Sequence, residues 1–114
     1  MEVNIGIIRM IFDLIETMDE GLDYIEEKEN EQSMKLELLE DLGLGIKSIE
    51  DSIEGMKEEL ISNEILEMGN KLIESINIVN EKKIIQDEDS FLLKKNYNIF
   101  KAELERCLKS YIMC

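Results

Sequence analysis

Apolar residues recur at alternating steps of three and four along most of this chain, and the chain contains no proline. A 3-4 repeat sustained over three or more heptads indicates helices that pack along a seam. Without proline, no residue forces such a helix to end. The repeat therefore predicts an all-α fold. It runs through Ile8, Ile11, Ile15, Met18, Leu22 and Ile25, then Leu39, Leu42, Ile46, Ile49, Ile53, Met56 and Leu60, and finally Leu93, Tyr97, Phe100, Leu104, Cys107, Tyr111 and Cys114.

Polar stretches separate these runs from one another and from a less regular run between them. They define four expected helices, over residues 4–28, 33–55, 58–81 and 88–113. Similar lengths and short connections favour an antiparallel up-down four-helix bundle with heptad-type packing. The first helix supports a bundle, because apolar residues beside its seam widen the stripe beyond what a two-stranded coiled coil needs. We predict one helical-bundle domain over residues 1–114.

Polar residues are expected to set the helix ends. Asn30 or Ser33 would cap the second helix at its N-terminus. Asp87 or Asp89 would cap the last helix and complement its dipole. Between the second and third helices we expect a turn within residues 55–63, near its start. One long helix with a slip in the phase of the repeat is the alternative there.

Three glycines lie beside the seams of the first two helices. Gly21 flanks the first seam, and Gly43 and Gly45 flank the second. Glycine costs about 1 kcal/mol relative to alanine inside a helix, so some compensation is expected. Close approach of two helices is the favoured explanation, and a break within residues 42–46 is the alternative.

The net charge of −14 belongs to the first half of the chain. Residues 1–64 hold 19 acidic and 5 basic side chains, whereas residues 65–114 hold 8 of each. The acidic half would repel a phosphate backbone, and the other half has no dense basic stripe, so nucleic acid is not an expected partner. No window approaches the roughly 20 apolar residues of a membrane span.

Two cysteines, Cys107 and Cys114, lie seven residues apart. On one helix they would be about 10 Å apart, which is too far for a disulfide bond. Unpaired thiols are typical of a reducing compartment. The apolar start of the chain lacks a preceding basic region and a small-residue cleavage site. We therefore expect a cytoplasmic protein.

The chain contains no histidine. This excludes the Glu-x-x-His sites of di-iron bundles, histidine phosphorelays and catalytic pairs of histidine with serine or cysteine. Two cysteines at this spacing match no zinc module, and no phosphate-binding loop is present. The acidic residues of the first helix lie off its seam and are expected to form a solvated face. We therefore predict no catalytic residue, no cofactor and no metal site.

The last helix carries apolar residues that its seam does not use. Exposed apolar patches usually bind a partner, so these residues form the candidate partner surface. We predict a non-enzymatic protein–protein interaction module, an adaptor or chaperone-like bundle that docks a partner helix or forms a homodimer. Acidic rims would steer a basic partner. The candidate residues are Leu92, Ile99, Ile112 and Met113.

The stretch 20–55 resembles small uncharacterised acidic helical-bundle proteins of low-GC Gram-positive bacteria. An acidic first helix followed by LLEDL-x-x-GI-x-x-IE-x-SI carries this resemblance. In size, acidity and helicity the chain also resembles flagellar export chaperones of the FliT and FlgN kind. That resemblance implies a bundle that shields a partner's helix, and it implies no catalytic residues.

Two alternative functions use the carboxylates directly. One is a small metal-dependent enzyme built on carboxylates alone. The other is an acidic protein that mimics DNA or neutralises a basic toxin, and it predicts binding that weakens strongly with salt.

Overall fold

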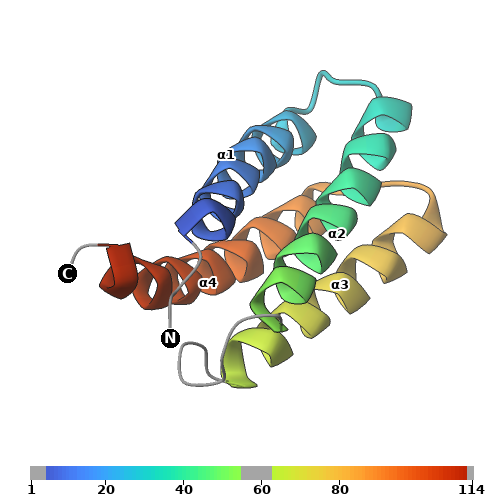
Figure 1. The fold of residues 1–114 in the computed structure, drawn as a ribbon. Helices are drawn as coiled ribbons and strands as arrows, with labels where there is room; N and C mark the ends of the chain where they lie inside the picture. The colour runs from blue at the N-terminus through green and yellow to red at the C-terminus, as the bar shows by residue number, and fades with distance from the viewer. Residues whose placement is uncertain (1–4, 55–62, 113–114) are drawn as a thin grey trace.

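The computed structural model describes residues 5–54 and 63–112. Their helices are α1 (Ile5–Glu26), α2 (Gln32–Glu54), α3 (Asn63–Lys82) and α4 (Asp87–Ile112). Neighbouring helices run antiparallel (Figure 1), and contacts join α1 to α2, α2 to α3, α3 to α4, and α4 back to α1. This ring within one chain confirms the all-α, antiparallel up-down four-helix bundle.

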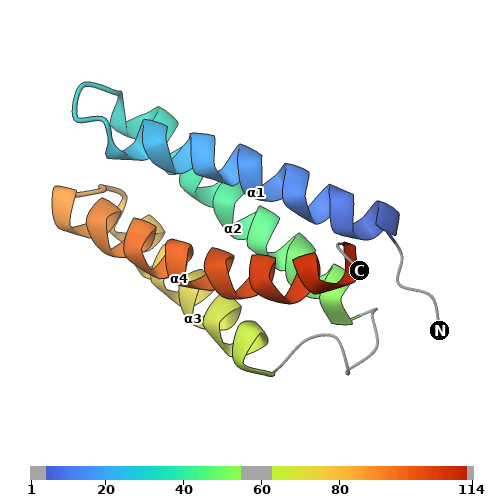
Figure 2. The same cartoon turned by 90° about the vertical axis from the view of Figure 1, so that its left-hand side faces the viewer.

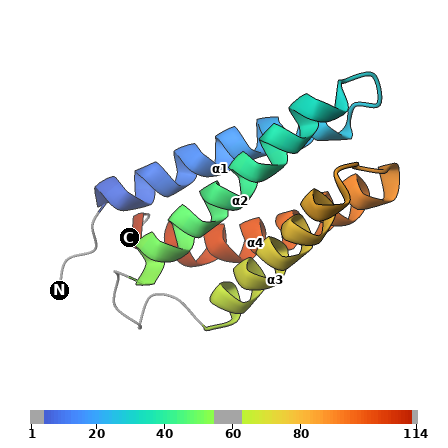
Figure 3. The same ribbon diagram turned by 90° about the vertical axis from the view of Figure 1, so that its right-hand side faces the viewer.

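The bundle is elongated, with extents of 47 × 21 × 18 Å. The α1–α2 and α3–α4 connections lie at the same end, and the start of α1 and the end of α4 lie at the other (Figures 2 and 3). None of the described helices is long and apolar enough to cross a membrane.

The apolar repeat forms the core. On α1 and α2 the repeat residues that the structure describes are all buried, and Ile65, Leu72, Ile76 and Val79 are buried on α3. Tyr97 and Phe100 on α4 are the largest fully buried side chains, each 1% exposed. The Tyr97 hydroxyl donates a 3.0 Å hydrogen bond to the carbonyl of Ile15 on α1. This satisfies the hydroxyl, which burial would otherwise leave without a partner.

The seam of α4 changes phase towards its C-terminus. Leu108 is 1% exposed and takes the core position that the repeat predicts for Cys107, which is only partly buried. The buried positions step by four from Phe100 to Leu104 and by four again to Leu108. A straight α-helix drifts against a strict seven-residue repeat, so a second step of four keeps the stripe on the core side.

The turn between α1 and α2 differs from the prediction. The Asn30 side-chain amide donates a 2.9 Å hydrogen bond to the carbonyl of Tyr24, one of the last carbonyls of α1. Asn30 therefore closes the C-terminus of α1 at Glu26 and does not cap α2. The first helical hydrogen bond of α2 runs from Lys35 N to Glu31 O at 3.1 Å, so Glu31 holds the cap position in place of Asn30 or Ser33.

The turn between α3 and α4 is held by Asp89. Its carboxylate accepts hydrogen bonds from Lys82 Nζ at 2.8 Å and from Gln86 N at 3.0 Å. Burial acts to raise the pKa of Asp89, but the hydrogen bonds from Lys82 and Gln86 outweigh it and lower the pKa below the ordinary value. Asp89 thus caps the helix from inside its first turn. Lys83 adopts a left-handed backbone conformation (φ 59°), which ends α3.

The expected ends of the middle helices fall partly outside the described residues. Residues 58–62, predicted to begin the third helix, are outside, as are Gly55 and the turn predicted beside it. Residue 113, the predicted end of the last helix, is also outside.

Gln32 joins the two turns at this end of the bundle. Its side-chain amide exchanges two hydrogen bonds with the main chain of Ile85, 2.9 Å from Ile85 N and 3.1 Å to Ile85 O. Ile85 is 5% exposed, so these main-chain groups have little access to water. The pair fixes the α3–α4 turn against the start of α2.

We expect Gln32→Ala to lower the free energy of unfolding by about 1–2 kcal/mol, because it leaves the part-buried N–H and C=O of Ile85 without their side-chain partners. Urea unfolding followed by circular dichroism measures this. Gln86→Ala, in the same turn but with an exposed side chain, is the control and should change stability by less than about 0.5 kcal/mol. Equal effects of the two substitutions would contradict the role given to Gln32.

The two glycines of α2 differ in how closely a neighbouring helix approaches them. A Cβ at Gly45 would lie 2.9 Å from Met18 Sδ on α1, and one at Gly43 would lie 3.5 Å from Ile76 Cγ2 on α3. Helix α2 continues unbroken through both positions, so the alternative of a break is wrong. Close approach explains Gly45, whereas a Cβ at Gly43 would make only an ordinary van der Waals contact. The same expectation is wrong for Gly21, because a Cβ there would meet no heavy atom within 4 Å.

Glu50 on α2 lies inside the bundle, with 4% of its surface exposed. A Cβ on Gly69 of α3 would lie 2.9 Å from Glu50 Oε2, so the carboxylate occupies the space that this glycine leaves. Burial raises the pKa of Glu50 above its ordinary value, the positive charge of Lys47 opposes the rise, and nearby carboxylates add to it. Glu50 is therefore a buried acid held next to an apolar core.

Candidate functional site

The outer face of α4 carries large apolar side chains in contact with solvent. Of the predicted partner surface, Leu92 is 45% exposed and Ile99 is 49% exposed. Phe91, which was not among the predicted residues, is 66% exposed. The side chain of Ile112 and all of Met113 lie outside the described part of the chain.

Ile78 extends this face onto α3, where it is 62% exposed. It lies four residues before Lys82, and Leu92 lies three residues after Asp89. Lys82 and Asp89 form an ion pair of 2.8 Å between the two helices. Residues three or four apart share a helix face, so Ile78 and Leu92 lie on the same side of the bundle, one turn beyond this pair. The signal for Ile78 was its position off the seam of its helix.

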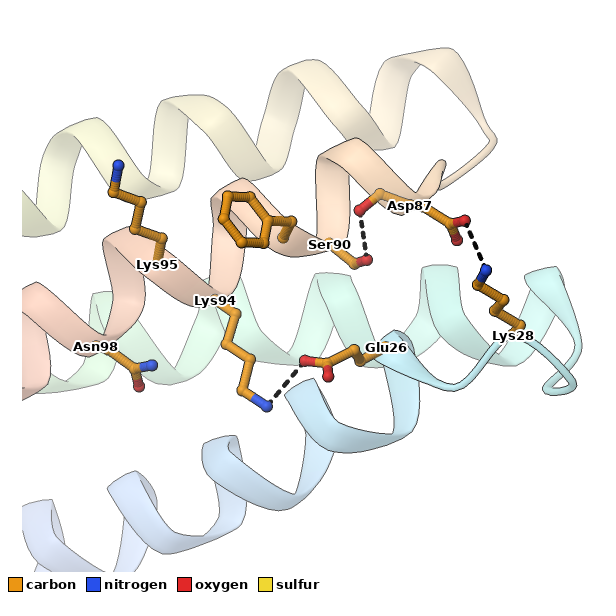
Figure 4. Close-up of a pocket in the computed structure, with 8 residues that line it drawn as sticks. Glu26, Lys28, Asp87, Ser90, Lys94, Lys95 and Asn98 are labelled. Carbon is orange, nitrogen blue, oxygen red and sulfur yellow. Dashed lines mark hydrogen bonds and ion pairs between the residues drawn. The ribbon is translucent and has the colours of Figure 1, made fainter.

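A hollow of about 540 Å³ lies beside Phe91, between the C-terminal end of α1 and the first turns of α4. Figure 4 shows Lys94 reaching from α4 to Glu26, and Lys28 reaching to Asp87. The two ion pairs measure 2.8 Å and 3.4 Å. The residues that line the hollow are Glu26, Lys28, Asp87, Ser90, Phe91, Lys94, Lys95 and Asn98.

The cations of this hollow differ in what they contact. Lys94 contacts both Glu26 and Asp23, and hydrogen bonds to Glu26 and then Asp23 raise its pKa. Lys95 extends away from Lys94 in Figure 4, and it has no ion-pair partner within the described residues. Lys95 is therefore the cation of the hollow that is available to a partner.

The acidic face of α1 is partly neutralised by α4. Besides the pairs made by Lys94, Lys101 Nζ lies 2.6 Å from Asp19 Oδ2. Such partly exposed ion pairs contribute about 0–1 kcal/mol each. These ion pairs connect α1 to α4 at the surface, so the carboxylates of Asp19, Asp23 and Glu26 are already paired with lysines.

No group of three or more histidine, cysteine, aspartate or glutamate side chains could hold a metal ion within residues 5–54 and 63–112. Two of the three carboxylates in residues 87–89 already have other partners, because Asp87 contacts Lys28 and Asp89 caps α4. A molecule that binds the described surface would therefore meet exposed apolar side chains and charged side chains.

Comparison with known families gives one finding for this chain. Residues 6–106 match a family described as a domain of unknown function, DUF8042. Comparison with curated proteins and with solved structures gives no match.

Proposed function

The chain belongs to the DUF8042 family, and from the geometry of α4 we propose that it is a non-enzymatic protein-interaction module. The partner docks a helix on the outer face of α4, over Phe91, Leu92 and Ile99. This is the helix-in-groove mode of recognition, in which apolar anchors give affinity and charges give orientation. We further propose a cytoplasmic adaptor or chaperone-like role, supported by the acidic composition and by cysteines whose spacing does not suit a disulfide bond.

The exposure of apolar side chains on a helix whose inner stripe is already filled carries this proposal. Leu93, Tyr97 and Phe100 fill the core side of α4 at 1–2% exposure. The bundle closes without the apolar residues of the outer face, so these add nothing to its core. Covering each of them with an apolar partner surface would gain roughly 1 kcal/mol, because about half of each side chain remains to be buried.

The charged residues on the outer face of α4 restrict which helices could dock there. Helix α1 holds six acidic residues and one basic residue, whereas α4 holds five of each. Cations on the outer face of α4 include Lys95 and Arg106, both exposed. A docked helix would therefore need a pattern of alternating charges, while the acidic surface of α1 and α2 favours approach by basic groups.

Site-specific photo-crosslinking in the native cell tests the proposal. We expect a benzophenone amino acid in place of Ile99 to give a discrete protein adduct. The same residue in place of Leu44 is the matched control, because Leu44 is 64% exposed on α2 but lies away from α4. Absence of adducts from position 99, or equal adducts from both positions, would contradict docking on α4.

A further inference from the structure

We propose that a second copy of this chain is the partner, with the outer faces of two α4 helices packed antiparallel. This inference rests on the proposed function, because it uses the same face of α4.

The outer face of α4 carries a second 3-4 repeat. Its steps alternate between four and three, as they do along most of the buried seam on the other side of the helix. Each of its members is exposed. A stripe with this period is the pattern by which one helix packs along another. Its members are Glu88, Leu92, Lys95, Ile99, Ala102, Arg106 and Lys109.

The order of charges along this stripe selects the antiparallel arrangement. The acidic residue, Glu88, lies at the N-terminal end, and Arg106 and Lys109 lie at the C-terminal end. A parallel pair would place each charge opposite its own kind. In an antiparallel pair, Glu88 of each copy lies opposite Arg106 of the other. Opposite charges at such flanking positions set partner choice and orientation in helical pairs.

Charge also selects the register. With Glu88 opposite Arg106, Leu92 falls opposite Ala102 and Ile99 opposite Lys95, whose methylene chain can cover it. Sliding one copy by seven residues, so that Ile99 meets Ala102, would place Lys95 opposite Arg106. That register brings like charges together and loses the Glu88 contact. The first register has two attractive pairs and no like-charged pair along the stripe.

The charges of the rest of the molecule point to the same face. Two chains of net charge −14 repel each other over most of their surface, and α4, with equal numbers of acidic and basic residues, is where they can approach. At physiological salt this repulsion is screened beyond about 8 Å. Arg106 is available to a partner, because its ion pair with Glu103 is on the surface and its side chain is 71% exposed.

The size of the contact predicts a weak dimer. The 18 residues from Glu88 to Arg106 span about 27 Å of helix. A contact of one helix face, widened by Ile78, buries less than the roughly 1,200 Å² of stable complexes. We therefore expect a dimer that exchanges with monomer and is populated at protein concentrations of about 0.1–1 mM.

Charge exchange between the two ends of α4 tests the arrangement by sedimentation equilibrium in about 0.15 M salt. Glu88→Lys and Arg106→Glu should each weaken dimerisation roughly tenfold or more, because each variant places two like-charged pairs in the dimer. The double variant should recover the wild-type constant. An equimolar mixture of the two single variants should form a heterodimer, since both of its pairs are then of opposite charge.

Matched controls carry the same changes of net charge on α2, which lies diagonally across the ring of helices from α4. Glu40→Lys and Lys47→Glu alter exposed residues there and should leave dimerisation within about twofold of wild type. Circular dichroism verifies that every variant keeps its helical content. A wild-type chain that stays monomeric at about 1 mM, or single variants whose mixture does not pair, would overturn the proposed dimer.

The crosslink at position 99 separates failure of this inference from failure of the proposed function. An adduct of twice the 13.3 kDa chain mass supports the dimer. Adducts of other masses alone would overturn self-docking and leave the proposed function standing. Absence of any adduct would overturn both.

Discussion

Tyr97→Ala is expected to lower the free energy of unfolding by about 3–5 kcal/mol, the range for removal of a large buried aromatic side chain. Tyr97 is 1% exposed and lies among the largest side chains of the core. Its ring fills the space between α4 and α1, and its hydroxyl bonds to the carbonyl of Ile15. Most of the effect should therefore come from the cavity, and a smaller part from the hydrogen bond.

Tyr97→Phe separates these two contributions. It keeps the ring and removes the hydroxyl, so we expect a loss of about 1 kcal/mol. Burial, followed by the neighbouring Asp19, raises the pKa of Tyr97 above its ordinary value of 10.0. The stabilisation by the neutral phenol is therefore complete below pH 10.0 and is lost as the pH rises through the higher pKa of the folded state.

Urea unfolding of both variants at pH 7 measures the two losses. Tyr24→Ala is the control, because Tyr24 is only half-buried on α1 and should lose less than Tyr97→Ala. A loss below about 1.5 kcal/mol for Tyr97→Ala would show that α4 does not depend on this ring.

The buried seam residues were predictable from the sequence, because apolar side chains recur along each helix at the spacing that places them on one face. Ile8, Leu39 and Leu104 are each 0% exposed, as the 3-4 repeat predicts. The repeat also identified Leu92 and Ile99 as residues outside the seam. Phe91 and Ile78 satisfy the same criterion, and applying it to every helix would have found them.

The helix ends were less predictable, because they depend on groups distant in sequence or on competing roles of one side chain. Asn30 has the chemistry of an N-cap, yet it bonds to the preceding helix. Gln32 reaches a main chain 53 residues away. Nothing in the local sequence distinguishes these contacts from their alternatives.

The burial of Glu50 was not predictable, because it depends on another helix. Glu50 follows the seam residue Ile49, and a carboxylate at such a position usually points to solvent. Gly69, on α3, leaves the space that the carboxylate occupies. Only the packing of α2 on α3 shows that this acid lies inside the bundle.

Glu50→Gln is expected to raise the free energy of unfolding at pH 7 by about 1–2 kcal/mol, because a largely buried carboxylate that forms no ion pair among the described residues destabilises the fold. The nearest helpful charge is Lys47, one turn away on the same helix, and Glu54 and Asp51 oppose it. Among the described residues, the charges that shift the pKa of Glu50 lie on α2, and its carboxylate lies against Gly69 of α3, which Phe100 of α4 also approaches. Glutamine keeps the shape and removes the charge. The melting temperature should rise by roughly 4–8 °C.

The pH dependence gives the sharper test of this prediction. The carboxyl of the unfolded chain titrates near 4.5, and that of the folded chain titrates higher. The favourable contribution of neutral Glu50 is therefore complete below pH 4.5 and is lost as the pH rises through the folded-state pKa. Asp89 acts in the opposite sense, because its lowered pKa contributes stability above pH 3.8 that is lost on acidification.

Melting curves between pH 4.5 and 8 should therefore show the Glu50→Gln advantage growing as the pH rises, since the wild type alone must keep a charge in the core. Glu37→Gln, at an exposed position of α2, removes the same charge from the surface and should give a difference that is small and nearly independent of pH. A Glu50→Gln advantage that stays constant over this range would show that packing, and not the buried charge, limits stability at this point of the bundle.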